Sequence, residues 1–353
     1  NWSISVAKRA LSKGVTLDKG LKGDFDGTKA VTREEACLYG LNMMKAYKFE
    51  YPNDQTVIVG NVSVSTSAKA EQQDGENDEP YYRTVFTNLS CTKVTDDFGR
   101  PSTKWTYKGV KIGTYADAAD LSYVGSVKLN EIYKDLDMST KDDAAVIYVN
   151  NGENALTPAN KGDFEVSKSN DKKLSAIDDR IGDGTIVEVY RNDDTNDVTI
   201  VAISVYGGKI SDVKAATSKK DAYVTVDPSS THPSDFNDEY ETEAFEEDDV
   251  VAYTYSDSAE EIKSMYKMES VEGELTKRVA TKSLTLGDTT YKFAKGIGFD
   301  SDVKNEAGLT NKSEYVVYLD ANGLALYVEE ASFSASNYAL VVKMTNEIGR
   351  AHV

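Results

Sequence analysis

The chain has 353 residues, of which 40% are hydrophobic and 10% aromatic, enough for roughly two to four domains with buried cores. It carries 40 Lys and Arg against 59 Asp and Glu, a formal net charge of −19. This charge excludes nucleic acids and anionic membrane surfaces as partners, because their phosphates require a basic face. The sequence contains no long apolar run, so it predicts no membrane span. The composition favours an extracellular protein.

The first 44 residues predict a helix, a loop and a second helix. The apolar residues Val6, Ala7, Ala10 and Leu11 form one stripe at helical spacing. A loop rich in Gly and Asp follows over residues 15–31. Thr32 can then cap the second helix by accepting from the N–H of Glu35, while Glu35 reaches back to the N–H of Thr32.

This segment resembles an S-layer homology (SLH) motif truncated at its start. The resemblance rests on Trp2, the first helix, Gly14-Val15, Phe25, Asp26-Gly27 and Val31-Thr32-Arg33-Glu34-Glu35. It implies a bacterial surface protein in which several such motifs assemble and hold a cell-wall polysaccharide. Since one motif cannot complete that assembly, we expect further motifs in the parent protein. The residues that the resemblance assigns to polymer binding are Trp2, Asp26, Thr32 and Arg33.

Arg33 is the strongest single candidate for a ligand contact. Its guanidinium presents a planar fork of donors that suits a carboxylate or phosphate. A structural role is the alternative, in which Arg33 covers the helix start or pairs with Asp24 or Asp26. The sequence departs from the family motif in two ways: the proline usual before Asp26 is absent, and Glu34 replaces a small residue and places a negative charge that opposes anion binding.

Periodicity changes from helical to alternating near Tyr51, which predicts a mainly β protein with a small N-terminal helical motif. Strands are expected at 56–65, 81–92, 104–107, 110–112 and 144–149, with one short helix over 127–136. Asn150-Asn151-Gly152 favours a hairpin turn after the last of these strands.

The second half of the sequence repeats a pair of strands. Residues 185–193, 249–257 and 314–322 each form an apolar stretch that ends in Asp, Asn or Ser and precedes another strand. Aligning Val187, Val251 and Val316 predicts serial β modules about 64 residues long. Chance similarity among strands rich in Val and Tyr is the alternative.

These patterns predict the division of the chain. We expect an SLH-like helix-loop-helix over 1–50, a β-rich domain over 51–180, a β module over 181–247 that ends in an acidic linker, a β module over 248–312 and a partial module over 313–347. Residues 348–353 (IGRAHV) match one translated frame of a common sequencing adapter, so we expect a non-native tail that packs against nothing.

The sequence predicts no catalytic site and no required cofactor. Its two histidines are His232, between Pro and Ser residues, and His352, in the tail, so a placed imidazole is not expected. The loop after Lys22 lacks the ligands of an EF-hand but leaves room for weak, irregular Ca²⁺ binding. Cys37 and Cys91 favour free thiols, and whether they pair stays open.

The leading hypothesis is a non-enzymatic, cell-wall-anchored surface protein whose SLH motif binds cell-wall polysaccharide and whose β modules project outward. The modules would then serve a structural or adhesive role and could associate with one another in a surface lattice. The alternative is the accessory, carbohydrate-binding region of a secreted enzyme that acts on polysaccharide. Exposed aromatic strips on a sheet face would favour this alternative, because they offer sugar rings a flat platform.

Overall fold

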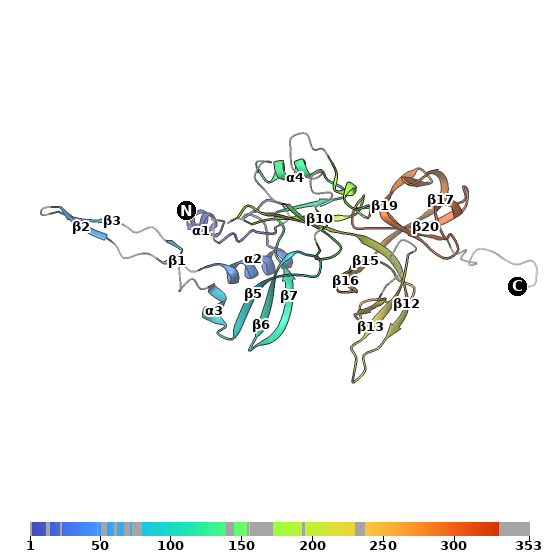
Figure 1. The fold of residues 1–353 in the computed structure, drawn as a ribbon. Helices are drawn as coiled ribbons and strands as arrows, with labels where there is room; N and C mark the ends of the chain where they lie inside the picture. The colour runs from blue at the N-terminus through green and yellow to red at the C-terminus, as the bar shows by residue number, and fades with distance from the viewer. Residues whose placement is uncertain are drawn as a thin grey trace, which may run out of the picture. The chain divides into compact units, whose positions relative to one another are not determined.

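The computed structural model describes residues 2–331 except 12–14, 22, 48, 51–54, 60–61, 67–70, 73–79, 139–144, 154, 156–171, 193–194 and 230–236. Side chains are described outside 2–4 and 49–72. The predicted fold class is confirmed, since strands dominate after a short helical start (Figure 1). No described helix is long and apolar enough to cross a membrane. The expected tail at 348–353 and His232 lie outside the described residues.

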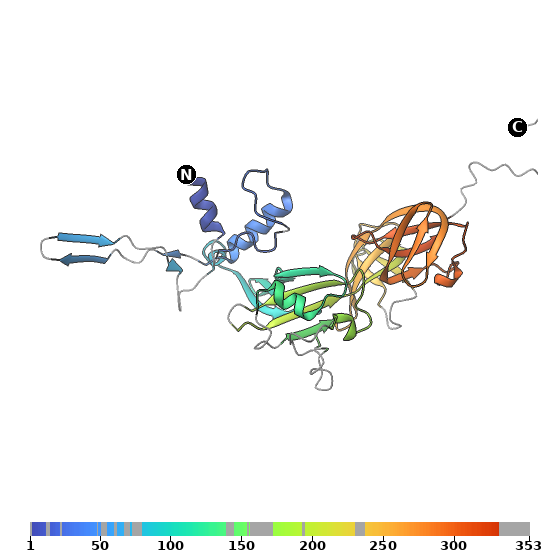
Figure 2. The same cartoon turned by 90° about the horizontal axis from the view of Figure 1, so that it is seen from above.

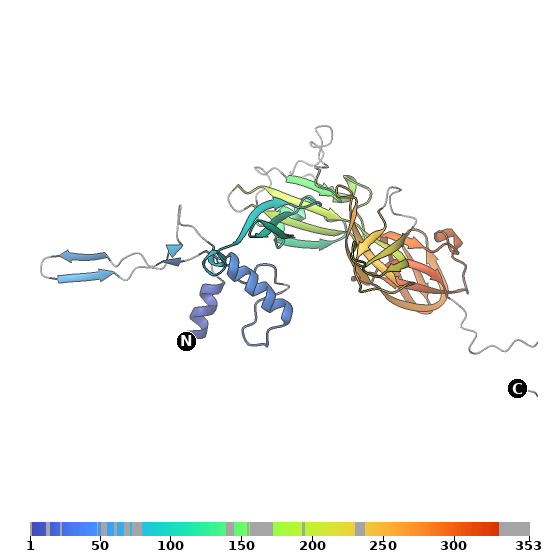
Figure 3. The same cartoon turned by 90° about the horizontal axis from the view of Figure 1, so that it is seen from below.

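The chain divides into two compact units, residues 1–204 with 256–260, and residues 205–255 with 261–353. The first unit begins with α1 (Trp2–Ala10) and α2 (Arg33–Lys45), joined by a long loop (Figure 3). Its smaller elements are β1 (Phe49–Glu50), β2 (Gln55–Val59), β3 (Val62–Thr66), β4 (Glu71–Gln72), α3 (Tyr81–Val85), β5 (Leu89–Thr95), β6 (Pro101–Tyr107) and β7 (Val110–Ala116). Strands β1 and β4 pair, β2 and β3 form a hairpin, and β5, β6 and β7 form a three-stranded antiparallel sheet.

A four-stranded sheet and one helix complete the first unit. Its elements are β8 (Leu121–Val124), α4 (Leu129–Asp135), β9 (Ala145–Val149), the 3₁₀ turn η2 (Leu174–Ala176), β10 (Ile186–Arg191) and β11 (Val198–Ile203). The sheet order is β8-β10-β11-β9, with β9 parallel to β11. Helix α4 buries Leu129, Ile132 and Tyr133 against the sheet, which forms the largest core of this unit.

The described residues of the second unit form ten strands in two consecutive groups. The first group is β12 (Val205–Lys214), β13 (Tyr223–Pro228), β14 (Glu239–Glu241), β15 (Val250–Ser256) and β16 (Glu261–Lys267). The second is β17 (Glu269–Val279), β18 (Ser283–Leu286), β19 (Thr289–Phe299), β20 (Glu314–Leu319) and β21 (Ala325–Glu330), with the turn η3 (Glu306–Gly308) before β20. The second group closes into a barrel, visible in orange and red in Figure 2.

The two groups are copies of one topology. The first has the order β14-β13-β12-β15-β16, and the barrel repeats this order five strands later along the chain. In the barrel, β19 and β21 also pair in parallel and close the ring, which gives a five-stranded Greek-key barrel, the topology class that includes OB-folds. The four-stranded sheet of the first unit, β8-β10-β11-β9, has the same order as β17-β20-β21-β19 of the barrel. The barrel strand β18 has no counterpart in this sheet, and α4 lies at its place in the sequence.

The same backbone hydrogen bond occurs at an equivalent position in all three modules. The N–H groups of Gly125, Ile210 and Leu275 donate to the carbonyl oxygens of Thr185, Asp249 and Ser313 over 2.7, 2.8 and 2.9 Å. The three acceptors lie 64 residues apart. Each is preceded by a residue with positive φ, namely Gly184, Asp248 and Lys312. Strands β12 and β17 also share a bulge, after Ile210 and Leu275 respectively.

This register corrects the sequence alignment by one residue in the last module. Val187, Val251 and Tyr315 occupy equivalent positions, because they pair with Tyr123, Gly208 and Gly273 at the same distance from the shared hydrogen bond. All three are fully buried. The neighbouring Val316 lies on the opposite face of its strand, since side chains alternate along a strand. An alignment error of one residue therefore assigns every side chain of the strand to the wrong face.

The acidic segment expected as a linker is part of the second module. Its described residues 237–249 form β14 and the turn into β15. Phe245 packs against the core, and the N–H of Asp248 donates to Ile210 over 2.9 Å. The first module therefore runs from Leu121 to Ile203, the second from Val205 to Lys267 and the third from Glu269 to Glu330, so the expected boundaries at 180, 247 and 312 all fall inside modules.

Two local predictions were wrong for identifiable reasons. The expected strand at 81–92 begins as helix α3, because Pro80 occupies its N-cap and Tyr82 turns inward to meet Trp105 at 5.0 Å between ring centroids. The expected two-residue hairpin turn is not formed by the described residues 150–153, because neither Asn151 nor Gly152 has the positive φ that it requires. Asn150 instead has positive φ, and its buried amide binds the N–H and Oγ of Ser204 over 2.7 and 3.0 Å. The expected helix at 127–136 is confirmed as α4.

The shared positive φ predicts that stability falls when glycine is removed from this position in the first module and rises when glycine is introduced there in the third. Gly184→Ala should lower the free energy of unfolding by about 1–2 kcal/mol, the cost of a left-handed L-residue. Lys312→Gly should raise it by about 0.5 kcal/mol, because the relieved strain exceeds the entropy cost of glycine. Urea denaturation of both variants measures this. Lys277→Gly, within β17, is the control and should destabilise; destabilisation by Lys312→Gly of the same size would contradict the strain argument.

Candidate functional site

The loop before α2 is ordered by its own side chains. The Asp26 carboxylate accepts from the N–H of Thr28 over 2.9 Å and from its hydroxyl over 2.6 Å. These hydrogen bonds lower the pKa of Asp26, because they favour its charged form. Asp26 is therefore engaged in an Asx turn within the loop.

Helix α2 begins with the predicted capping box. The hydroxyl of Thr32 accepts from the N–H of Glu35 over 3.2 Å, and Glu35 accepts from the N–H of Thr32 over 2.8 Å. Lys29 also pairs with Glu35 at 2.8 Å. The hydrogen bond from Lys29, followed by that from Thr32, lowers the pKa of Glu35. Thr32 thus has a structural role at the positive end of the helix.

Arg33 is the first residue of α2 and is exposed. Within the described part of the chain, its guanidinium makes no hydrogen bond or ion pair. The structural role considered for it, a pair with Asp24 or Asp26, does not form, because Asp26 binds Thr28 instead. The fork of Arg33 is therefore available at a helix N-terminus, where the backbone N–H groups also favour an anion. Trp2 is the first residue of α1, and its side chain lies outside the described residues.

Helix α2 itself buries no residue. No hydrophobic staple forms across the helix start, since Val31 is 56% exposed and Ala36 is also exposed. Its contacts to the loop include hydrogen bonds from the Asn42 amide to the carbonyl oxygens of Leu17 and Lys19, over 2.8 and 2.9 Å, and an edge-to-face contact of Tyr39 with Phe25 at 6.1 Å between ring centroids. The Asn42 hydrogen bonds fix the path of the loop but supply little hydrophobic stabilisation.

Asp117 connects the helical motif to the β5–β7 sheet. Its carboxylate receives Lys45 of α2 at 3.1 Å, Lys93 of β5 at 2.7 Å and the hydroxyl of Thr103 at 2.9 Å. Burial alone would raise the pKa of Asp117, but the hydrogen bond and charge of Lys93 and the charge of Lys45 outweigh it and lower the pKa. Asp117 also borders a cavity of about 810 Å³ in the first unit.

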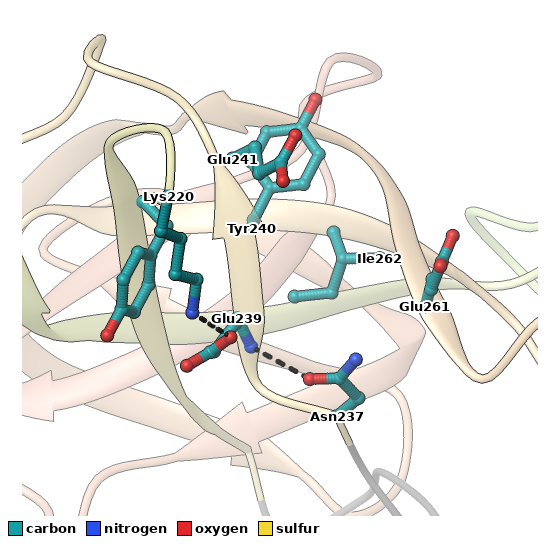
Figure 4. Close-up of a pocket in the computed structure, with 8 residues that line it drawn as sticks. Lys220, Asn237, Glu239, Tyr240, Glu241, Glu261 and Ile262 are labelled. Atoms are coloured by element: carbon teal, nitrogen blue, oxygen red, sulfur yellow. Dashed lines mark hydrogen bonds and ion pairs between the residues drawn. The ribbon is translucent and has the colours of Figure 1, made fainter. Parts of the chain in front are cut away.

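A second cavity of about 400 Å³ lies in the second module (Figure 4). Its wall includes both edges of the open sheet, β14 and β16, where the third module instead closes its barrel. Tyr223 and Tyr240 are the aromatic residues of this wall, and three glutamates contribute charge: Glu239, Glu241 and Glu261. The ammonium group of Lys220 lies 3.5 Å from the ring centroid of Tyr223 and 2.6 Å from Glu239. One aromatic face is therefore already covered by a cation.

The described residues were searched for groups that could bind a metal ion and for cysteine pairs. No group of three His, Cys, Asp or Glu side chains lies together there in the arrangement of a metal site. Cys37 and Cys91 are both free, the first exposed and the second half-buried. Cys91 lies 3.2 Å from the Tyr82 hydroxyl.

The Asp117 cluster predicts a pH-dependent contribution to stability. Because folding lowers the pKa of Asp117, its contribution is complete above the unfolded pKa near ~4 and is lost as the pH falls through the folded pKa. Asp117→Asn should cost about 1–2 kcal/mol at neutral pH, since Lys93 is exposed to screening solvent. The difference from wild type should shrink below pH ~4. Urea titrations across pH measure it, with Asp24→Asn, which removes an exposed carboxylate, as the control.

The chain was compared with family models, curated proteins and solved structures. None of them matches it. The geometry of the described residues is therefore what supports a function.

Proposed function

We propose that this chain belongs to a non-enzymatic bacterial surface protein that is held on the cell wall through its N-terminal helix-loop-helix. The observation that carries the proposal is the state of Arg33, exposed and without an ionic partner in the described residues at the start of a capped helix. The ligand is an anionic cell-wall polysaccharide, whose carboxylate or phosphate groups fit the guanidinium fork. Asp26 and Thr32 support the site by ordering the loop and the helix start.

The exposure of α2 supports the proposal that this motif packs against similar motifs in the parent protein. A helix that buries no residue gains little from packing, so its stability depends on neighbours that cover it. In the proposed protein, those neighbours are further SLH motifs, and the groove between them holds the polymer. The β modules then project outward from the wall in an extracellular location.

The alternative function, a carbohydrate-binding region of a secreted enzyme, has one observation in its favour. The cavity of the second module places two tyrosines among polar side chains, as sugar-binding sites do. Against it, Lys220 lies over the Tyr223 ring and removes that platform. We therefore prefer the anchored surface protein.

Arg33→Ala should weaken retention of the protein with its full set of motifs on purified cell-wall sacculi about 10- to 100-fold, the loss of a charged hydrogen bond. Arg33→Lys should lose most of this affinity as well, because a point charge lacks the fork. Lys8→Ala removes an exposed charge from the same motif and should bind like wild type. Equal retention of wild type and Arg33→Ala at physiological salt would place anchoring elsewhere.

A further inference from the structure

The cavity of about 810 Å³ in the first unit has the size of a binding site for a small molecule. Pockets that enclose small molecules measure roughly 300–1,000 Å³. One wall is a row of paired residues across the four-stranded sheet, in which Thr199 of β11 pairs with Tyr190 of β10 and with Val146 of β9. The adjacent residue Ile200 belongs to the core that α4 covers on the other face of the sheet. The sheet face that α4 leaves uncovered therefore forms this wall.

The other walls come from segments that lie far away in the sequence. Lys19 belongs to the loop between α1 and α2, Lys93 to β5, and Asp120 to the segment between β7 and β8. A smaller cavity of about 270 Å³ shares Lys19 and Lys93 with it and adds Lys45 of α2. The helical motif, the β5–β7 sheet and the four-stranded sheet therefore all contribute to two adjacent cavities.

The walls of these cavities carry more positive than negative charge, although the chain has a net charge of −19. Their charged residues are Lys19, Lys45, Lys93 and Arg191 against Asp117, Asp120 and Asp197. Asp117 is shared by Lys45 at 3.1 Å and Lys93 at 2.7 Å. Lys19 pairs with Asp120 at 3.6 Å. Since three carboxylates do not balance four cations, the site can still accept an anion.

Arg191 is only partly satisfied by the protein. It forms no ion pair within the described part of the chain, and its Nη2 donates to the side-chain oxygen of Asn196 over 2.6 Å. Its Nε is buried and has no hydrogen-bond acceptor among the described residues. A buried donor without an acceptor is costly, so the guanidinium gains a partner when it turns toward an anionic oxygen in the cavity. The Lys93 side chain is 76% exposed and can reorient with it.

The other polar side chains of the wall suit hydroxyl groups. Asp197 accepts from the hydroxyl of Thr195 over 2.6 Å and has further lone pairs, and the hydroxyl of Thr199 can donate or accept. Val146 and Val198 add apolar surface beside them, which suits the carbon face of a ring. A ring with several hydroxyls and one anionic group matches this combination.

We propose that this cavity binds a saccharide that carries an anionic group. Arg191 and Lys93 contact the carboxylate or phosphate, and the side chains around Asp197 contact the hydroxyls. A neutral sugar leaves the excess positive charge of the wall unmatched, so it should bind more weakly. The inference goes beyond the proposed wall anchoring, because it does not use Arg33 and neither proposal depends on the other.

Isothermal titration calorimetry of the full chain at low salt tests the inference with three ligands. They are digalacturonate, its dimethyl ester, which keeps both rings but has no charge, and galactose 6-phosphate. Wild type should bind at least one of the two anionic sugars at least ~10-fold more tightly than the neutral ester. Salt should weaken that binding, and the preferred ligand identifies the anion as carboxylate or phosphate.

Two kinds of variant locate the binding in the cavity. Arg191→Ala should weaken binding of the preferred sugar about 10-fold or more, and Arg191→Lys should restore only part of it, because a point charge lacks the fork. Thr199→Trp fills the cavity from the sheet and should abolish binding. Lys277→Ala, which removes an exposed lysine of the third module, is the control and should bind like wild type. Thermal unfolding verifies that each variant folds.

Three results would overturn the inference. Wild type could bind neither anionic sugar, it could bind the dimethyl ester as tightly as digalacturonate, or the folded Arg191→Ala and Thr199→Trp variants could bind like wild type. Retention on sacculi, measured in parallel, keeps the two proposals apart. Unchanged retention of Arg33→Ala contradicts wall anchoring only, whereas unchanged sugar binding by Arg191→Ala and Thr199→Trp contradicts the cavity site only.

Discussion

The β part of this protein depends on one backbone constraint that occurs three times. In each module a residue in or directly after the first strand donates its N–H to the residue that enters the strand paired with it, as Gly125 does to Thr185. The residue before each acceptor is left-handed: Gly184, Asp248 and Lys312 share positive φ. Once this bond is set, alternation places Val187, Val251 and Tyr315 inside their cores.

The modules differ in how the remaining edges are covered, and those differences create the surfaces available for function. In the third module the long strand β19 reaches β21 and closes a barrel. In the first, α4 buries Leu129, Ile132 and Tyr133 instead of a second strand. In the second, β14 has three residues and leaves the seam open, with a cavity beside it.

Charge is distributed unevenly along the chain. The chain is strongly acidic, yet residues 98–116 around the β6–β7 hairpin contain no Asp or Glu, while residues 237–249 around β14 contain no Lys or Arg. Exposed charges contribute little to the stability of the monomer, because solvent screens them. Their effect is larger on association, where complementary fields guide the encounter and opposing fields prevent it. The fold positions these surfaces and does not itself assign an activity.

The sequence alone determined the features that depend on local chemistry. The capping box at Thr32 and Glu35, helix α4 and the strand pairs of the repeats follow from periodicity and short-range hydrogen bonds. Tertiary structure decided what depends on distant partners. Asn150 looks like a hairpin turn, but Ser204, 54 residues away, binds its amide. The acidic segment reads as a linker because charge suggests solvation, yet Phe245 and the bond from Asp248 to Ile210 fold it into a module. Val316 appeared equivalent to Val251 because both are valine, whereas the register of β17 with β20 selects Tyr315.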